Sequence, residues 1–331
     1  MHLGSSDPLS LRPSGAQNGV AASGPSPDVS VVVPTRDRAA MLHRALRSVL
    51  AQRSIDLEVV VIDDGSTDET EQVVRSLEDV RVRIIRHETP RGVATARNAG
   101  AAAARGRWIA LLDDDDLWAP DKLVRQLTTA QEHGARWVYA GAVEIGESGR
   151  LLGGQRPPSP AVLIRQLDRR NLMPAGSSNV LVDAETFRSA GGFDPALRHL
   201  ADWDLWLRLA RQGEPACVPE PLVAYRLHGG QATLDTTGMM AEARMLRDRH
   251  GVDVNAIRRW LAWSHLRRGR RREAVGAYAR AAASGDLASV GRAAVAALHP
   301  RPAAVRSRAT SVEDIEWAGS AQTWIRAASG D

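Results

Sequence analysis

Residues 108–120 read WIALLDDDDLWAP, and this stretch is the most informative part of the chain. An apolar run typical of a buried strand ends in four consecutive aspartates, Asp113–Asp116. If the strand stays extended, Asp113 and Asp115 share one face at roughly 6–7 Å. At an effective dielectric constant of about 20, their repulsion is on the order of 2–3 kcal/mol. The run therefore predicts water screening, a protonated carboxyl or a bound divalent cation, with a solvated turn or helix cap as the alternative for one or two aspartates.

Strands and helices alternate along the first half of the chain. The apolar patterns predict strands at 29–33, 57–62, 82–86 and 108–112, and helices at 39–52, 67–78, 93–104 and 120–133. This alternation at short spacing predicts an α/β fold with a doubly wound, mostly parallel, Rossmann-like sheet. Ligands of such sheets bind at the carboxyl ends of strands, so the loops after the first, second and fourth strands are expected to form a site.

The regions outside these repeats have a different character. Residues 1–27 are rich in Ser, Gly and Pro and are expected to be a disordered leader. Further elements are expected as a strand pair at 136–145, a helix at 202–211 and a short strand at 222–226. The sheet domain would then span 28–238, followed by a helical C-terminal segment at 239–331. Within that segment, residues 255–284 predict two amphipathic helices joined near Gly269.

The composition excludes several classes of protein. Cys217 is the only cysteine, so a disulfide framework and cysteine-based zinc sites are excluded. No apolar stretch reaches the length of a membrane span, and the N-terminus has no signal-peptide pattern. We therefore expect a cytoplasmic protein, with peripheral attachment to the inner membrane face left open. The net charge is +4, and the basic residues are interspersed along the chain without a long basic block, so nucleic-acid binding is not expected.

A second polar loop, IDDGSTDET at residues 62–70, follows the second predicted strand. Gly65 permits a positive φ or the close approach of a ligand. The carboxylates beside it are suited to the N–H edge of a base or to ribose hydroxyls, although acids at a helix N-terminus are the simpler explanation. A hard ion such as Mg²⁺ or Mn²⁺ at the four aspartates would bring substrate phosphates with it.

These segments together resemble family 2 glycosyltransferases, which have the GT-A fold. The resemblance rests on VSVVVPTRDRAAMLHRALRSVLAQ (29–52), LEVVVIDDGSTDET (57–70) and RGVATARNAGAAAARGRWIALLDDDDLWAPDKL (91–123), and covers about residues 29–235. It implies transfer of a sugar from a nucleotide-diphosphate donor to an acceptor hydroxyl, with inversion and with Mn²⁺ or Mg²⁺ as cofactor. The nucleotide-binding half would be 28–145 and the acceptor half 146–238.

The resemblance also implies roles for individual residues. The donor would be bound by Pro34, Thr35, Asp63, Asp64, Arg97, Asp113 and Asp114. The metal ligands would be Asp115, Asp113 and His228. Because all four positions of the run are aspartate, the register of the D-x-D motif stays open.

The catalytic base is expected in RHLADWDLWLRLARQG, residues 198–213. An inverting transfer needs a general base that deprotonates the acceptor hydroxyl. By the resemblance, Asp202 falls on the position of this base, and Asp204 is the alternative. The position before it is often Glu in the family and is Ala201 here, which leaves acceptor positioning open.

The partners follow from the same resemblance. A UDP-sugar is the expected donor, the acceptor is a glycan, a lipid-linked sugar or a small molecule, and a homodimer is left open. Two other functions are alternatives to sugar transfer. One is a non-catalytic nucleotide-sugar-binding module of the same fold, which Ala201 favours. The other is a phosphohydrolase with Asp113 as nucleophile, which needs a lysine near the phosphate, whereas the only lysine, Lys122, lies on the following helix.

Overall fold

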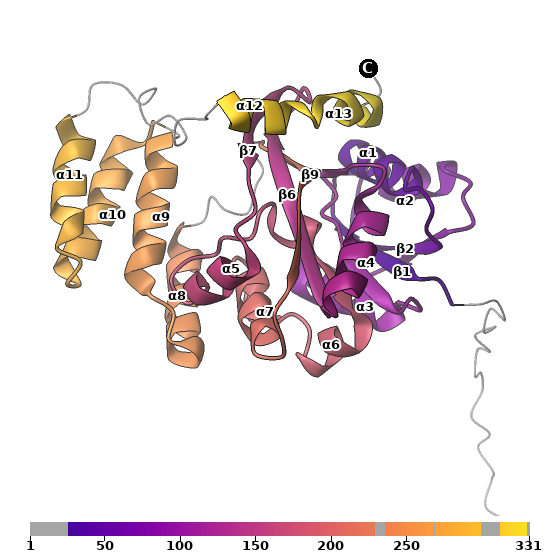
Figure 1. The fold of residues 1–331 in the computed structure, drawn as a ribbon, viewed down its shortest axis with the longest axis horizontal. Helices are drawn as coiled ribbons and strands as arrows, with labels where there is room; N and C mark the ends of the chain where they lie inside the picture. Colours follow the sequence, from indigo (N-terminus) through magenta and orange to yellow (C-terminus); the bar gives the residue numbers. More distant parts are fainter. Residues whose placement is uncertain (1–25, 229–235, 268, 299–311, 330–331) are drawn as a thin grey trace, which may run out of the picture.

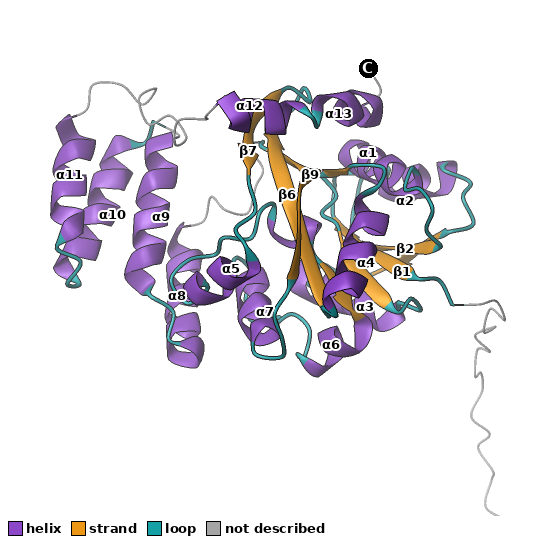
Figure 2. Ribbon diagram, in the orientation of Figure 1, coloured by secondary structure: helices purple, strands orange, loops and turns teal. Residues whose placement is uncertain are grey.

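The computed structural model describes residues 26–228, 236–267, 269–298 and 312–329. Within them one nine-stranded sheet is covered by helices on both faces (Figures 1 and 2). The leader expected at 1–27 lies outside the described residues except for its last two. No helix in the described ranges combines the length and the apolar character needed to cross a bilayer.

The first half of the chain forms the parallel part of the sheet, as predicted. Strands β1 (Val29–Thr35), β2 (Leu57–Asp63), β3 (Val82–Arg86) and β4 (Trp108–Leu111) lie in the order β3-β2-β1-β4. Helices α1 (Ala39–Leu50), α2 (Thr70–Ser76) and α3 (Val93–Ala103) connect them. Because β1 and β2 are buried along their whole length, most of their residues are apolar.

The second half completes the sheet with mixed pairing. Its strands are β5 (Leu117–Trp118), β6 (Trp137–Ile145), β7 (Leu151–Gln155), β8 (Leu181–Asp183) and β9 (Ala216–Arg226). The order continues as β4-β8-β6-β9-β5, with β8 antiparallel to both neighbours and β6 parallel to β9. The strand pair expected at 136–145 is one long strand, β6. The expected strand 222–226 is the end of β9. The first part of β9 was not predicted because it contains Pro219 and Pro221, near which the register against β6 shifts.

The remaining helices cover the sheet and extend beyond it. They are α4 (Lys122–His133), α5 (Pro160–Gln166), the 3₁₀ turn η1 (Gly176–Asn179), α6 (Ala184–Ser189), α7 (Ala201–Ala210), α8 (Thr236–His250), α9 (Val254–Arg267), α10 (Arg271–Ala283), α11 (Ala288–Leu298), α12 (Val312–Gly319) and α13 (Gln322–Ser329). Helices α9 and α10 match the two predicted around Gly269, which has φ +73° at their junction.

Two parts of the C-terminal segment pack on the sheet domain. Met239, Ala243 and Leu246 of α8 are buried in the same apolar core as α7, so packing continues past the boundary expected at residue 238. Helix α12 returns to the sheet near β7 and β9, and α13 lies near β5 and α1 (Figure 1). The ring of Trp317 occupies the space that a side chain at position 141 or 154 would need, and both positions are glycine. The absence of side chains at these two glycines therefore makes room for the C-terminal helices.

Candidate active site

The four aspartates form a turn and not the extended strand end assumed from the sequence. Strand β4 ends at Leu111, and the N–H of Asp116 donates to the carbonyl of Asp113 at 3.2 Å. The turn points the carboxylates in different directions, so the predicted sharing of one face by alternate aspartates is wrong. The partners of the four aspartates come from β1, α3, η1, β9 and the loops that follow β1 and β9.

Asp114 and Asp115 share one arginine. Arg38 Nη1 lies 3.0 Å from Asp114 Oδ1 and 2.9 Å from Asp115 Oδ2. The hydroxyl of Thr35 donates to Asp114 at 2.7 Å, and His228 Nε2 is 2.8 Å from Asp115 Oδ2. The structure thus brings together Thr35, Asp114, Asp115 and His228, which the sequence analysis had placed in one site. It adds Arg38, which that analysis had not singled out.

Asp113 and Asp116 are held on the other side of the turn. Asp113 forms an ion pair with Arg97, and its backbone N–H donates to the hydroxyl of Ser178 at 3.0 Å. That hydroxyl in turn donates to Asp116 Oδ2, while the N–H of Arg226 donates to Asp116 Oδ1 at 2.9 Å. Asp116 is fully buried and is served by neutral donors, whereas Asp113 is partly open to solvent.

These contacts change the electrostatic argument made from the sequence. Burial, and then repulsion from Asp115, raises the pKa of Asp114 to about 6, although Arg38 and Thr35 act against the rise. Burial also raises the pKa of Asp116 well above its usual range. Since arginines and protonation already relieve the repulsion, the acidic run does not by itself require a divalent cation. The case for a metal must come from the kinds of ligand present.

The loop after β2 is folded by its two aspartates. Asp63 accepts from the N–H of Ser66 and from Arg86, each at 2.8 Å. Asp64 accepts from the N–H groups of Arg91 and Gly92 at 2.8 Å, and also contacts His87. Asp64 therefore fixes the loop that leads into α3 and Arg97. The N–H of Asp64 donates to the carbonyl of Thr35, which ties this loop to β1, where Pro34 precedes Thr35.

Asp202 stands at the first turn of α7 and faces the same site. Its carboxylate lies 3.5 Å from Asn171 Nδ2, and a Cβ added to Gly176 would come within 3.3 Å of it. Burial raises the pKa of Asp202, the guanidinium of Arg97 opposes this, and the carboxylate of Asp113 raises it further. Arg97 thus acts on Asp113 and Asp202 together, although the two aspartates are 89 positions apart in the sequence.

Arg97 is fixed by packing as well as by charge. Its side chain is nearly buried, and its guanidinium lies over the ring of Phe193 at 5.0 Å. Its Nε is buried and has no hydrogen-bond partner within the described part of the chain. A buried donor without a partner normally needs an explanation. An oxygen of a bound substrate that accepts a hydrogen bond from this Nε would supply the missing partner.

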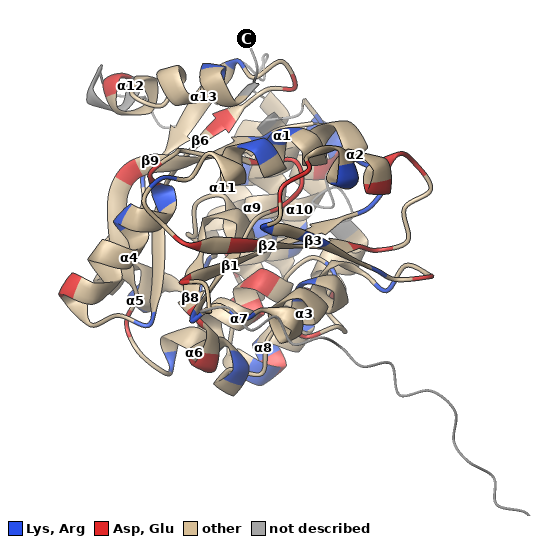
Figure 3. Ribbon diagram, turned by 90° about the vertical axis from the view of Figure 1, so that its right-hand side faces the viewer, with Lys and Arg blue, Asp and Glu red and all other residues tan. Residues whose placement is uncertain are grey.

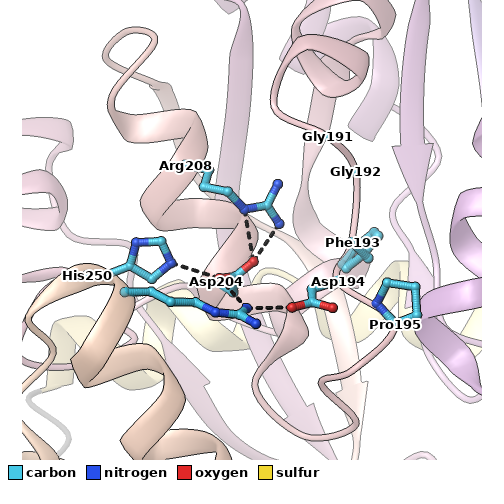
Figure 4. Close-up of a pocket in the computed structure, with 9 residues that line it drawn as sticks. Gly191, Gly192, Phe193, Asp194, Pro195, Asp204, Arg208 and His250 are labelled. Carbon is cyan, nitrogen blue, oxygen red and sulfur yellow. Dashed lines mark hydrogen bonds and ion pairs between the residues drawn. The ribbon is translucent and has the colours of Figure 1, made fainter.

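Asp204, the alternative base, serves a structural role. It accepts from Arg208, at 2.9 and 2.6 Å, and lies 2.8 Å from His250 Nε2 of α8 (Figure 4). These residues line a cavity of about 340 Å³ on the far side of α7, next to Gly191, Gly192 and Phe193. With both oxygens occupied and the side chain buried, Asp204 braces α7 against α8 and does not face the aspartate turn.

Helix α8 also holds the start of α7 through one carboxylate. Glu242 Oε1 accepts from the N–H of Arg198, and Oε2 accepts from the N–H groups of His199 and Leu200, all at 2.8–2.9 Å. These donors immediately precede the first turn of α7, where backbone N–H groups lack partners within the helix. Glu242 is therefore a positioning residue for Asp202, supplied from beyond the boundary expected at residue 238.

Replacing this carboxylate should disturb α7 before it disturbs donor binding. We expect Glu242→Gln to lower the free energy of unfolding by about 1–3 kcal/mol, because an NH₂ group would face backbone donors. Turnover should fall more than donor affinity. Urea unfolding and steady-state kinetics measure the two effects, with the exposed Glu185→Gln as control. Wild-type turnover in Glu242→Gln would refute the positioning role.

The only lysine of the chain is not available to a phosphate. Lys122 is fully buried, its Nζ donates to Gln126 at 2.8 Å, and it lies 3.9 Å from the ring centre of Trp118. Burial lowers the pKa of Lys122 well below its usual value. A phosphohydrolase with Asp113 as nucleophile would need a charged lysine at the aspartates, so this function is not supported.

The buried lysine makes a distinct prediction for stability. Because burial lowers the pKa of Lys122 in the folded chain below its unfolded value of 10.5, the unfolded chain binds the proton more tightly, and wild-type stability rises with pH up to that value. We expect any stability advantage of Lys122→Met to be largest at low pH. The advantage should shrink as the pH rises toward 10, by at most about 1.4 kcal/mol per pH unit. Urea unfolding at pH 7, 8 and 9 measures this, and a difference independent of pH would contradict it. The exposed Arg75→Met is the control.

Several residues of the site were missed from the sequence. Burial raises the pKa of Tyr225, and nearby carboxylates contribute, namely those of Asp116, Asp115, Asp113 and Asp202. Tyr225 therefore lies among the acidic groups of the site. Arg38, Ser178 and Arg226 are the other additions. Arg38 lies in the loop after the first strand, where part of the site was expected, but hydrophobic patterning gives no signal for the pairing of any of the three.

The residues present suit a divalent ion that is also held by its substrate. In the described residues no group of three or more His, Cys, Asp or Glu side chains is arranged to hold a metal by itself. Mg²⁺ and Mn²⁺ at phosphate sites commonly use one or two carboxylates and complete their shell with phosphate oxygens and water. Asp115 and His228, whose ligand atoms lie 2.8 Å apart, fit that requirement. Acidic and basic segments are interleaved around β1, β2 and β3 (Figure 3).

Comparison with known proteins agrees with this fold. The model of the family described as glycosyl transferase family 2 matches residues 30–189. A putative teichuronic acid biosynthesis glycosyltransferase, TuaG of Bacillus subtilis (strain 168), is 31% identical over 205 residues, covering 61% of this chain and 79% of that protein. The chain is therefore a glycosyltransferase, and it belongs to glycosyltransferase family 2.

Other relatives carry more specific names. The succinoglycan biosynthesis protein ExoO of Rhizobium meliloti (strain 1021) is 43% identical over 159 residues, which are 48% of this chain and 44% of ExoO, so less than half of that relative is spanned. WfgD of Escherichia coli is named UDP-Glc:alpha-D-GlcNAc-diphosphoundecaprenol beta-1,3-glucosyltransferase. It is 27% identical over 190 residues, which are 57% of this chain and 72% of WfgD.

A solved structure confirms the GT-A fold. The crystal structure of S. aureus TarS 1-349 in complex with UDP-GlcNAc superposes with a TM-score of 0.55 at 18% sequence identity, covering 67% of each chain. At this identity the likeness concerns the arrangement of the strands and helices. The α/β fold with a mostly parallel sheet, predicted from the sequence, is thereby confirmed.

Proposed function

We propose that this glycosyltransferase is metal-dependent and inverting, and moves a sugar from a UDP-sugar to an acceptor hydroxyl with Asp202 as general base. The observation that carries the proposal is the arrangement around Arg97. This one guanidinium contacts Asp113 of the acidic turn and acts electrostatically on Asp202. Donor-side and base-side carboxylates, encoded far apart, thus border one site, as an attack from the face opposite the leaving group requires.

The donor would lie along the carboxyl ends of β1, β2 and β4. Pro34 and Thr35 would border the base, and the loop fixed by Asp63 and Asp64 would lie beside it. In the structure Asp64 is engaged by backbone N–H groups, so a base edge would have to share or replace those contacts. Asp113 and Asp114 would reach the ribose, and Arg97, with its spare Nε, would face the diphosphate.

Asp115 and His228 would hold Mn²⁺ or Mg²⁺, with Asp113 as a further carboxylate nearby. Such an ion, when bound, supplies positive charge at the leaving diphosphate. Arg38 contacts both Asp114 and Asp115, so it is positioned to keep the turn folded when no ion competes for them. His228 Nε2, which lies 2.8 Å from Asp115 Oδ2, would be the ligand atom nearest that carboxylate once it carries no proton.

Asp202 would take the proton of the acceptor hydroxyl. Its raised pKa strengthens it as a base, and transfer should weaken as the pH falls through that pKa, because the protonated carboxyl cannot accept a proton. Ala201 precedes it where relatives often carry Glu, so the acceptor is oriented by other groups. Asn171 and the backbone at Gly176 are the nearest candidates.

A donor screen tests the proposal directly. Thermal shift with UDP-, GDP- and dTDP-sugars, each with and without Mn²⁺, should give the largest metal-dependent shift for a UDP-sugar. Hydrolysis of that donor, or transfer to glycan, lipid-linked or small-molecule acceptors, should follow. Binding without hydrolysis or transfer to any of these acceptors would instead favour a non-catalytic nucleotide-sugar-binding module, the function to which Ala201 points.

A further inference from the structure

Helix α11 exposes an apolar face that no described residue covers. Its large exposed side chains are Val290, Val295 and Leu298, which are 57%, 60% and 82% exposed, and Leu287 in the turn just before it is 79% exposed. They follow helical spacing on one side, while Ser289 and Ala296 are buried on the other. We call these four side chains the α11 face. Exposed apolar patches of this kind commonly mark contact with a partner or a membrane.

The helices that carry this face are also the most basic part of the chain. Residues 254–298 contain nine arginines and two acidic residues, a net +7, whereas the whole chain carries +4. Five of the six residues at 267–272 are arginine. The assumption of evenly interspersed charge, made from the sequence as a whole, is therefore wrong for this segment. Clusters of four to eight basic residues beside an apolar helix are typical of anionic lipid binding.

The fold brings the basic cluster to the end of the layer at which α11, and with it the Leu298 part of the α11 face, ends. Helices α9, α10 and α11 lie side by side, with α11 at the outer edge (Figure 1). Because successive helices reverse direction, the end of α9 at Arg267 and the start of α10 at Arg271 lie at the same end as Leu298. Arg270 and Arg272 lie at this end, whereas Arg280 lies in the last turn of α10 toward Leu287. All three are exposed, and none forms an ion pair with an acidic side chain in the described part of the chain.

We propose that the α9–α11 layer docks on the surface of an anionic lipid bilayer. The α11 face would enter the headgroup boundary, and Arg270, Arg272 and Arg280 would meet lipid phosphates. Trp260, 42% exposed on α9, has the side chain preferred at that depth. A second copy of the chain fits less well, because a symmetric contact would bring two +7 segments together. Nucleic acid would use the arginines but leave the α11 face without a role.

The docking would place the transfer site at the bilayer. Helix α9 packs against α8, whose Glu242 holds the start of α7 and hence Asp202. The acceptor side of the site would then lie near the lipid surface, as a lipid-linked acceptor requires. This last step rests on the proposed transferase function, whereas the docking itself does not.

Vesicle binding by the full chain tests the proposal. We expect flotation with vesicles of 30% phosphatidylglycerol in phosphatidylcholine, little with phosphatidylcholine alone, and release in high salt. Each arginine at an anionic surface contributes about fivefold, so Arg270→Gln/Arg272→Gln/Arg280→Gln should weaken binding roughly 100-fold. Leu287→Ser/Leu298→Ser should weaken binding by the same factor at every salt concentration at which the wild type still binds. The control is Arg75→Gln/Arg188→Gln/Arg211→Gln, three exposed arginines elsewhere, which should bind as the wild type does.

The outcomes are distinct. Equal binding to neutral and anionic vesicles, or unchanged binding by the first triple variant, would overturn the proposal. Binding to RNA without binding to vesicles, or a dimer that only Leu287→Ser/Leu298→Ser dissociates, would assign the surface to another partner and also overturn it. Donor hydrolysis in lipid-free buffer should be the same in all variants. A chain that binds vesicles but never turns over a donor would refute the transferase mechanism and leave the docking intact.

Discussion

Asp202→Asn is expected to bind the donor as tightly as the wild type and to lose turnover by on the order of 10³-fold. An amide has the shape of the carboxylate but cannot take the acceptor proton. Folding should not suffer, because burial raises the pKa of Asp202 and so disfavours the charged form that the amide replaces. Donor titration by calorimetry, thermal melting and single-turnover transfer measure the three quantities.

The matched variant is Asp204→Asn, two residues further along the same helix. Asp204 is bound by Arg208 and His250, so its loss leaves buried donors without their partner. We expect this variant to melt at a lower temperature by several degrees and to retain turnover per folded molecule. If Asp204→Asn is the inactive one and Asp202→Asn is active, the assignment of the base is wrong.

Asp115→Ala is the second substitution with a large expected effect. It removes the carboxylate that lies against both Arg38 and His228, so that donor turnover stimulated by Mn²⁺ should fall on the order of 10²-fold or more. The thermal shift given by a UDP-sugar should lose its dependence on Mn²⁺, while the part seen without metal should persist.

The control for this experiment is Asp121→Ala, which removes an exposed carboxylate close by in the sequence. It should keep the response to Mn²⁺. Titrating Mn²⁺ against a fixed UDP-sugar concentration for wild type and both variants separates the metal effect from donor affinity. An unchanged Mn²⁺ titration in Asp115→Ala would show that the ion, if it binds, is held elsewhere.

The parallel half of the sheet could be predicted because each of its signals is local. A strand buried on both faces is mostly apolar, as in β1 and β2, and each is followed by a helix with its own apolar stripe. The second half depends on pairing between distant segments. Strand β9 begins among prolines and shifts register against β6, which no local pattern reports. For the same reason one long strand, β6, was expected as a pair.

The candidate site divides in the same way. Aspartates after strands mark a site, and Asp113, Asp114, Asp115 and His228 do lie near one another. What the sequence could not provide is their pairing. Arg38 and Ser178 are ordinary surface-type residues whose role depends on the turn at 113–116, which replaced the expected extended strand end. Glu242 lies 40 residues after Asp202, and its role in holding the start of α7 becomes visible only when α8 is packed against α7.

The burial of Lys122 has a practical consequence for handling this protein. Reagents that acylate amines can find no lysine side chain on the folded chain, since the only one is enclosed by α4 and Trp118. Its appearance in a labelling experiment would report the opening of α4 at a single, known position. One peptide in a mass spectrum would then follow local unfolding, without any engineered probe.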